Sequence, residues 1–211
     1  MIEYRNISVK FKDKLLFENF NLKIEAGEKI MLFGKSGTGK SSLLKLLLGF
    51  IRPSEGEILV DGNPLDKKSV WQIRKITAYV SQNLEIGEGS IREYFKEFLC
   101  LNSNSCISYD EDKILKLFDF LELPHEFMSK KIEELSGGEK QRLAIISSVL
   151  IDREIYLLDE ITSALDTDMK HKVAEFFARD FNKTILIVSH DEIWKEFSNI
   201  RVLNLNGAYH V

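Results

Sequence analysis

The segment from Gly34 to Ser41 constrains the fold of this sequence more than any other. It fits the pattern G-x-x-x-x-G-K-[S/T], in which glycines let backbone N–H groups converge on a phosphate. A mostly apolar run at Lys29–Phe33 precedes it, which predicts a strand, and a leucine-rich run at Lys40–Phe50 follows, which predicts a buried helix. The loop therefore leads into a helix N-terminus, whose dipole also favours anions. This order predicts a nucleotide-binding protein without deciding which kind.

Apolar spacing along the rest of the chain predicts strands that alternate with helices. Apolar and polar residues alternate at Ile7–Phe11 and Phe20–Ile24, which predicts two strands near the start. From about residue 83 to residue 134 the spacing becomes helical, and we expect an inserted helical lobe there. Further strand-like runs lie at Glu57–Val60, Ile76–Val80, Ile155–Leu158 and Thr184–Val188. We predict a single α/β domain over residues 1–211 with a mainly parallel sheet.

Two turn signals predict hairpins. Asp61-Gly62 follows the strand-like run Glu57–Val60 and is typical of a two-residue hairpin turn. Near the end, Val202–Leu205 followed by Asn206-Gly207 predicts a final hairpin.

Composition narrows the classes of partner. The net charge of −4 gives no support to a nucleic-acid partner, and we expect none. Cys100 and Cys106 lack metal-site spacing, so we expect plain thiols in a reducing compartment. The start has no signal-peptide pattern, and no apolar stretch reaches the ~20 residues of a membrane span. We expect a cytoplasmic protein that can still dock on a membrane protein.

A second candidate phosphate site lies at Leu135–Arg142. Ser136, Gly137 and Gly138 stand just before an apolar helical run, so they predict another helix N-terminus able to receive phosphate. On its own this segment also fits an ordinary helix cap, although the phosphate site is favoured. Beside the loop at Gly34–Ser41, however, a second phosphate-receiving helix start favours a site that uses both.

This octapeptide resembles the signature motif of ATP-binding-cassette (ABC) proteins. The resemblance implies that two copies of the chain pair head to tail, as a homodimer with two nucleotides at the interface. Ser136 and Gly138 of one copy would then contact the γ-phosphate of ATP held by the other copy. Only one copy of each motif is present, so a working ATPase needs a second ABC ATPase domain.

The run Ile155–Glu160 resembles a Walker B strand with its catalytic glutamate. Successive side chains of a strand point to opposite sides, so its two terminal carboxylates can take different tasks. Asp159 can hold the hydration shell of Mg²⁺, while Glu160 faces the attacking water as base or orienter.

The remaining family motifs follow in the expected order. Gln82 matches the Q-loop glutamine, which contacts Mg²⁺ and water. Ser163–Asp166 matches the D-loop, which reaches across the dimer, and His190 matches the switch histidine at the γ-phosphate. Phe11 falls where the family stacks an aromatic residue, commonly a tyrosine, on adenine; a phenylalanine keeps the π-face and loses the hydroxyl.

The resemblance covers the chain from about Ile2 to Asn206. It implies a P-loop NTPase core of the RecA-like type with a mainly parallel sheet, an N-terminal antiparallel β subdomain, and an α-helical subdomain inserted at about 83–134. The expected ligands are ATP and Mg²⁺. The expected catalytic residues are Glu160, His190, Gln82 and Lys40, and the expected metal ligands are Ser41, Gln82 and Asp159. The expected nucleotide contacts are Phe11, Gly34, Lys35, Ser36, Gly37, Thr38, Gly39, Lys40, Ser41, Ser42, Gln82, Ser136, Gly137, Gly138 and His190.

Two segments point to a branch of the family. Residues 131–173 resemble the ATPase subunits of two-component bacterial systems described as iron exporters, which pair a short cassette with a separate small permease. The segment Gly87–Tyr94 is similar to exporter-type cassettes, whereas Ile161 departs from the usual Pro or Ala. The resemblance implies an integral membrane permease as partner, a metal ion such as iron as cargo, and a place on the inner face of the cell membrane.

Two other functions remain alternatives. A non-transport ABC ATPase would show a long coiled-coil insertion, or two cassettes with a basic linker, and the sequence has neither. A regulatory module that binds without hydrolysing would lack the base or the switch residue, whereas Glu160 and His190 are both present.

Overall fold

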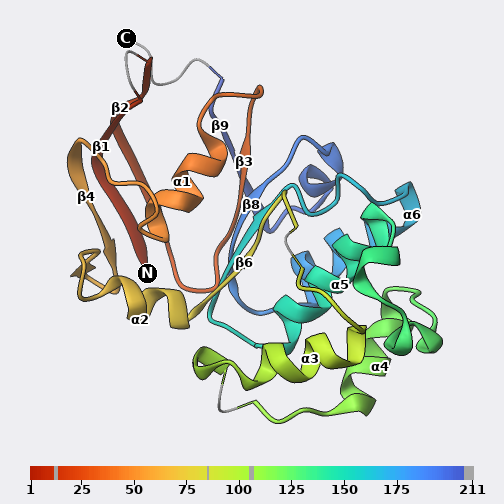
Figure 1. The fold of residues 1–211 in the computed structure, drawn as a ribbon. Helices are drawn as coiled ribbons and strands as arrows, with labels where there is room; N and C mark the ends of the chain where they lie inside the picture. The colour runs from red at the N-terminus through yellow and green to blue at the C-terminus, as the bar shows by residue number, and fades with distance from the viewer. Residues whose placement is uncertain (12–13, 85, 105–106, 207–211) are drawn as a thin grey trace.

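The fold consists of two sheets with a helix between them and further helices on one side (Figure 1). The computed structural model describes residues 1–11, 14–84, 86–104 and 107–206. None of the helices in these ranges has both the length and the apolar character needed to cross a bilayer.

The first sheet is antiparallel and has the strand order β2-β1-β4-β5. Its strands are β1 (Ile2–Phe11), β2 (Lys14–Ile24), β4 (Glu55–Val60) and β5 (Asn63–Pro64). The β4–β5 pair turns through Asp61-Gly62, where Val60 pairs with Asn63, so the hairpin predicted at this dipeptide is confirmed.

The second sheet is parallel throughout and has the order β6-β7-β8-β3-β9. Its strands are β3 (Lys29–Phe33), β6 (Thr77–Val80), β7 (Ile155–Asp159), β8 (Thr184–Val188) and β9 (Ile200–Asn204). The final hairpin predicted at Asn206-Gly207 would use residues 207–211, which lie outside the described residues, so it stays a prediction. The last described strand, β9, pairs in parallel with β3, from Lys29 opposite Ile200 to Phe33 opposite Asn204.

Helix α1 (Lys40–Leu47) lies between the two sheets (Figure 1). Its leucines are buried in one cluster with residues of β1, β2 and β4, and with alternate residues of the parallel sheet such as Ile155 and Leu157. Because successive strand residues point to opposite faces, Tyr156 and Leu158 enter a second cluster with the helices on the other side of the sheet. The need to bury α1 on both sides explains its leucine-rich sequence.

The other face of the parallel sheet packs against several helices. These are α3 (Ile91–Cys100), α4 (Glu111–Phe120), α5 (Gly137–Leu150) and α6 (Thr167–Glu175), with a π-helical turn at Phe176–Asp180, while α2 (Val70–Lys75) leads into β6. Helices α3 and α5 each begin with a capping box, formed by Ser90 with Glu93 and by Ser136 with Glu139. The cap at Ser136 thus fixes the start of α5, as its sequence predicts.

Candidate functional site

A pocket of about 420 Å³ opens at the carboxyl ends of the central parallel strands. Ligands of open parallel α/β sheets commonly bind at this edge. The described residues that line the pocket are Leu16, Ser36, Gly37, Gly39, Lys40, Ser41, Ser42, Gln82, Glu160, Val188 and His190. The pocket therefore joins the glycine-rich loop to Gln82, Glu160 and His190, which lie far apart in the sequence.

The glycine-rich loop is folded tightly in front of α1. Gly37 and Gly39 have φ values of 80° and 94°, a region that side chains disfavour. A Cβ atom on Gly39 would also lie 2.5 Å from Cζ of the buried Phe17. The first N–H groups of a helix have no partner within it, so those of α1 are available to an anion at this end.

Residues at the base of the loop hold it in place. Gly34, Lys35 and Thr38 are not among the described residues that line the pocket. The Thr38 hydroxyl donates to the Lys35 carbonyl at 2.9 Å, and the Lys35 N–H donates to Oδ1 of Asn206 at 2.7 Å. Asn206 follows β9, so the end of the edge strand supports the entry to the loop.

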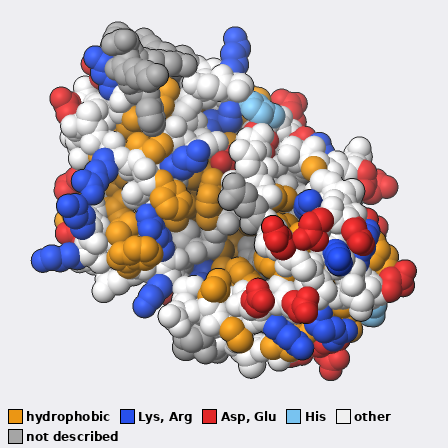
Figure 2. Space-filling model, in the orientation of Figure 1, with side chains coloured by type: hydrophobic (Ala, Val, Ile, Leu, Met, Phe, Trp, Pro, Cys, Tyr) orange, Lys and Arg blue, Asp and Glu red, His pale blue; other side chains and the backbone are white. Residues whose placement is uncertain are grey.

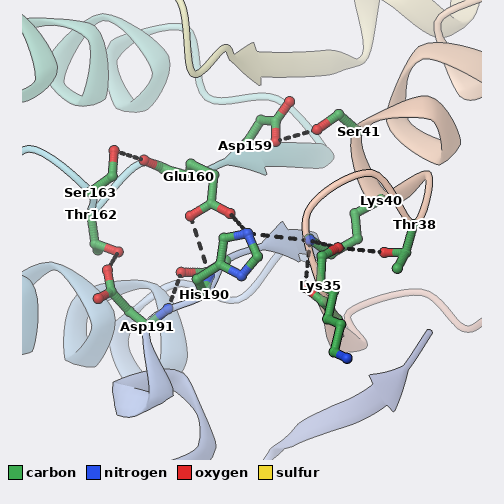
Figure 3. Close-up of polar contacts among 12 residues, drawn as sticks. Lys35, Thr38, Lys40, Ser41, Asp159, Glu160, Thr162, Ser163, His190 and Asp191 are labelled. Atoms are coloured by element: carbon green, nitrogen blue, oxygen red, sulfur yellow. Dashed lines mark hydrogen bonds and ion pairs between the residues drawn. The ribbon is translucent and has the colours of Figure 1, made fainter. Parts of the chain in front are cut away.

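Lys40 is buried, and its ammonium group faces the rest of the site (Figure 3). Nζ donates to the carbonyls of Gly34 at 2.7 Å and Lys35 at 3.1 Å, and it lies 3.4 Å from Nε2 of His190. Burial lowers the pKa of Lys40, although the negative charges of Glu160 and Asp159 act in the opposite direction. An anion bound at the loop would place a compensating charge beside this ammonium group.

Asp159, at the end of β7, lies next to the first turn of α1. Its Oδ1 accepts a hydrogen bond from the Ser41 hydroxyl at 2.9 Å, and its Oδ2 accepts one from the Tyr79 hydroxyl at 3.3 Å. Burial raises the pKa of Asp159 despite these hydrogen bonds. A carboxylate and a hydroxyl beside a phosphate loop are the oxygen donors that Mg²⁺ takes, with waters and phosphates completing its shell. These residues therefore fit a magnesium ion.

Glu160 is buried and contacts His190 twice. Its Oε2 accepts the backbone N–H of His190 at 3.2 Å, and its Oε1 lies 3.4 Å from Nε2 of the His190 ring. The backbone at Glu160 has φ 55°, the left-handed region that costs a non-glycine residue about 1 kcal/mol or more. Strained backbone of this kind is concentrated at functional sites.

Burial also raises the pKa of Glu160, with smaller opposing effects from His190 and Lys40. As the pH rises above the ordinary glutamate pKa, the unfolded chain releases this proton before the folded protein does. The free energy of unfolding therefore falls through that interval and stays lower at neutral pH. The charged carboxylate destabilises the fold, as expected for a group retained for its chemistry.

The structure places the predicted signature residues outside this pocket. Ser136, Gly137 and Gly138 are not among the described residues that line it; they form the start of α5, where Ser136 and Gly137 are exposed. Gly138 packs on the segment after β7, because a Cβ atom there would lie 2.8 Å from the Ala164 carbonyl oxygen. Within one chain the two phosphate-receiving helix starts are thus not brought together.

Phe11 and several further residues complete the comparison with the sequence. The side chain of Phe11, the predicted adenine contact, lies outside the described part of the chain. Sequence reasoning missed Leu16, which lines the pocket, and Tyr79, Asp191 and Asn206, which bond to site residues or their neighbours. The position of Asp191 directly after His190 was a signal that could have singled it out.

Comparisons with known proteins agree with this geometry. The family model described as ABC transporter matches residues 17–163. The chain is 32% identical over 200 residues to the energy-coupling factor transporter ATP-binding protein EcfA1 of Mycoplasmopsis synoviae, covering 90% of this chain and 74% of that protein. It is 33% identical over 197 residues to ABC transporter B family member 14 of Arabidopsis thaliana, covering 90% of this chain but only 16% of that much longer protein.

Among solved structures, the chain resembles the dimeric structure of a post-hydrolysis state of the ATP-binding cassette MJ0796 bound to ADP and Pi. The TM-score is 0.80 at 26% identity, over 97% of this chain and 95% of that one. The chain therefore belongs to the ABC transporter family. It is an ATP-binding-cassette ATPase with the P-loop fold.

Gly39→Ala should remove ATP binding. The added Cβ would clash with Phe17, and alanine disfavours the φ of 94° that Gly39 has at this position. The loop must therefore move away from the phosphate position. Gly62→Ala is the matched control, because Gly62 also has φ 77° but an added Cβ meets nothing within 4 Å. We expect isothermal titration with ATP to show lost affinity for Gly39→Ala only; equal affinities in both variants would contradict this description of the loop.

Proposed function

We propose that this chain is the ATP-hydrolysing subunit of an ABC transporter and powers transport through a separate membrane permease. The observation that carries the proposal is the meeting of Lys40, two buried carboxyls and His190 at one edge of the parallel sheet. These groups come from three separate parts of the chain, and each has a task in phosphoryl transfer.

Lys40, Ser41 and Asp159 would bind the triphosphate with its metal ion. Lys40 would contact the β- and γ-phosphates in place of the loop carbonyls, and the Ser41 hydroxyl and Asp159 would hold Mg²⁺ with its waters. Bound Mg²⁺ would neutralise phosphate charge. Gln82 is exposed and lines the same pocket, so it can complete the metal and water contacts and sense the γ-phosphate.

Glu160 and His190 would act on the attacking water. A carboxyl whose pKa is raised by burial accepts a proton more readily, so Glu160 suits the role of base or orienter. The hydrogen bond from the backbone N–H of His190 to the side-chain carboxylate of Glu160 holds both residues at one wall of the pocket. From there the half-exposed His190 ring can donate a hydrogen bond to the γ-phosphate.

A second copy of the chain would complete the site. The exposed signature residues at the start of α5 form an anion-binding helix end that the pocket of their own chain does not use. In a head-to-tail homodimer they would cover ATP bound to the partner, with Ser136 and Gly138 at the γ-phosphate and Gly137 beside the nucleotide. The dimeric state of the similar cassette with ADP and Pi supports this arrangement.

Glu160→Gln should stop turnover and trap an ATP-bound dimer. The neutral amide keeps the shape of the side chain but cannot accept the proton, so the closed state persists. We expect light scattering after size exclusion with MgATP to give twice the monomer mass for Glu160→Gln. The double variant Glu160→Gln/Lys40→Ala should give the monomer mass. A monomer at saturating MgATP in Glu160→Gln would argue against the sandwich.

A groove beside the ATP pocket offers a docking place for the permease. It has a volume of about 460 Å³ and runs between the end of β6 and helices α3 and α5. It is lined by Tyr79, Val80, Ser81, Asn83, Leu84, Ile86, Tyr94, Phe98, Ala144, Ser147, Ser148 and Ile151. Since Gln82 borders the ATP pocket and its neighbours Ser81 and Asn83 line the groove, a segment docked here would be linked directly to the nucleotide.

The surface next to this groove also suits a protein partner. In Figure 2 hydrophobic side chains with Lys and Arg among them gather over α1 and α2, and the surface is hollowed toward α3 and α5. Phe50 and Trp71 are 61% and 64% exposed, and the Arg74 guanidinium lies 4.6 Å and 4.8 Å from their ring centres. Exposed aromatic and arginine side chains are typical of interface anchors.

The cargo and the location are further parts of the proposal. The resemblance of residues 131–173 to subunits of two-component iron exporters supports export of a metal ion such as iron. A permease partner would hold the chain at the inner face of the cell membrane.

Asn83→Cys should cross-link to a membrane protein. In a chain with Cys100→Ser and Cys106→Ser, a cysteine at the exposed Asn83 lies beside the groove, whereas one at the exposed Asn182 lies at the opposite end of the parallel strands. After treatment of native membranes with a short bifunctional reagent, we expect a detergent-extracted adduct with Asn83→Cys and none with Asn182→Cys. Adducts with soluble proteins alone would favour the non-transport alternative.

A further inference from the structure

Asp191, the residue after His190, is held by two side chains from the other side of the site. Its Oδ2 accepts a hydrogen bond from the Thr162 hydroxyl at 2.5 Å, and its Oδ1 accepts one from Nζ of Lys170 at 2.8 Å. Burial acts to raise the pKa of Asp191, but the hydrogen bonds from Lys170 and Thr162 outweigh it and hold the pKa below its ordinary value. Asp191 is therefore a charged carboxylate with two specific donors.

The two donors flank one short segment of the chain. Thr162 is fully buried and stands directly before Ser163–Asp166; Figure 3 shows it facing Asp191. Lys170 lies in α6, just after the segment. Asp166 caps α6 by accepting the Met169 N–H at 2.9 Å. Both ends of Ser163–Asp166 are thus tied to the residue next to His190. We call Thr162, Lys170 and Asp191 the Asp191 clamp.

The clamped segment also contacts the start of α5. Gly138 approaches the Ala164 carbonyl so closely that a Cβ would lie 2.8 Å from it. At the other end, the Ser163 hydroxyl donates to the carbonyl of Glu160 at 2.8 Å. Ser163–Asp166 therefore lies between the signature residues and the Glu160–His190 pair, with the Asp191 clamp as the connection to His190.

The position of His190 depends on its backbone. The ring is half exposed, and its Nε2 lies 3.4 Å from both Nζ of Lys40 and Oε1 of Glu160. By contrast, Lys170 and Asp191 are only about a quarter exposed, at 25% and 24%, so their attraction is screened less than that of a surface pair. The ring is therefore held through the His190 backbone, which is anchored by Asp191 on one side and by its N–H bond to Oε2 of Glu160 on the other.

We propose that Thr162 and Lys170 are positioning residues which, through Asp191, hold His190 in its working place and tie that place to the segment Ser163–Asp166. This inference rests on the proposed ATPase function and deepens it. When a second copy presses on Ser163–Asp166, the clamp moves His190 relative to Glu160, so closure of the dimer and the geometry of hydrolysis change together. Binding of ATP, which depends on the glycine-rich loop, does not require the clamp.

Lys170→Met tests the clamp by separating turnover from binding. Because a small misplacement of a reacting group slows turnover strongly, we expect kcat to fall about tenfold, with KM for ATP within about twofold of wild type. Lys170→Arg should restore kcat, since it keeps the charge and the donors. The control is Lys172→Met on the same helix: Lys172 pairs with Glu122 at 2.7 Å, away from the site, and kcat should not change.

Thr162 and Asp191 provide independent variants. Thr162→Val removes the hydroxyl at nearly constant volume and should lower kcat, and Thr162→Ser should restore it. If Lys170 acts through Asp191, the double variant Lys170→Met/Asp191→Asn should be no slower than Asp191→Asn alone. Additive losses in this cycle, or equal falls in Lys170→Met and Lys172→Met, would overturn the clamp.

The two proposals fail in different ways. If the wild-type protein hydrolyses ATP and the Lys170→Met and Thr162→Val variants both keep its kcat, the clamp alone is overturned. A wild-type protein that binds ATP but hydrolyses none, with its permease present, overturns the proposed function and the clamp with it.

Discussion

The burial of two carboxyl groups beside one lysine underlies the whole site. Asp159 and Glu160 lie at the end of β7, whose residues are all buried, and both pKa values are raised by that burial. Such a pair is tolerated only where cations and hydroxyl donors face it, as Lys40, Ser41 and Tyr79 do here. The same arrangement suits a metal ion and a nucleotide. The metal ion would balance the negative charge of the two carboxyls, and the phosphates would balance the positive charge of Lys40.

Much of the fold could be predicted because local pattern and global packing agree. The alternating apolar residues at Ile7–Phe11, the buried run Ile155–Leu158 and the leucines of α1 all occupy the predicted kind of element. The final strand shows the limit of such reasoning. The apolar run Val202–Leu205 predicts a strand, but its pairing with β3, more than 160 residues earlier, follows from no local signal.

The site, like the fold, has one part that the sequence predicts and one part that it does not. Lys40, Ser41, Gln82, Glu160 and His190 line or border one pocket, as their motifs predict. The supporting contacts could not be predicted, because they join residues far apart in the sequence: Oδ1 of Asn206 accepts the Lys35 N–H, and the backbone of Gly138 packs close to the Ala164 carbonyl. The Asp191 clamp belongs to this second group, since only the fold brings α6 beside the residue after His190.

The central claim is that each ATP is held by two chains, and mixing two inactive variants tests it most directly. Lys40→Ala lacks a working loop and Ser136→Arg lacks a working signature, so each homodimer has two defective sites. In a mixed dimer one site takes its loop from the second variant and its signature from the first, and is intact. The account predicts that the mixture hydrolyses ATP well above the sum of the separate variants. A rate equal to that sum would contradict it.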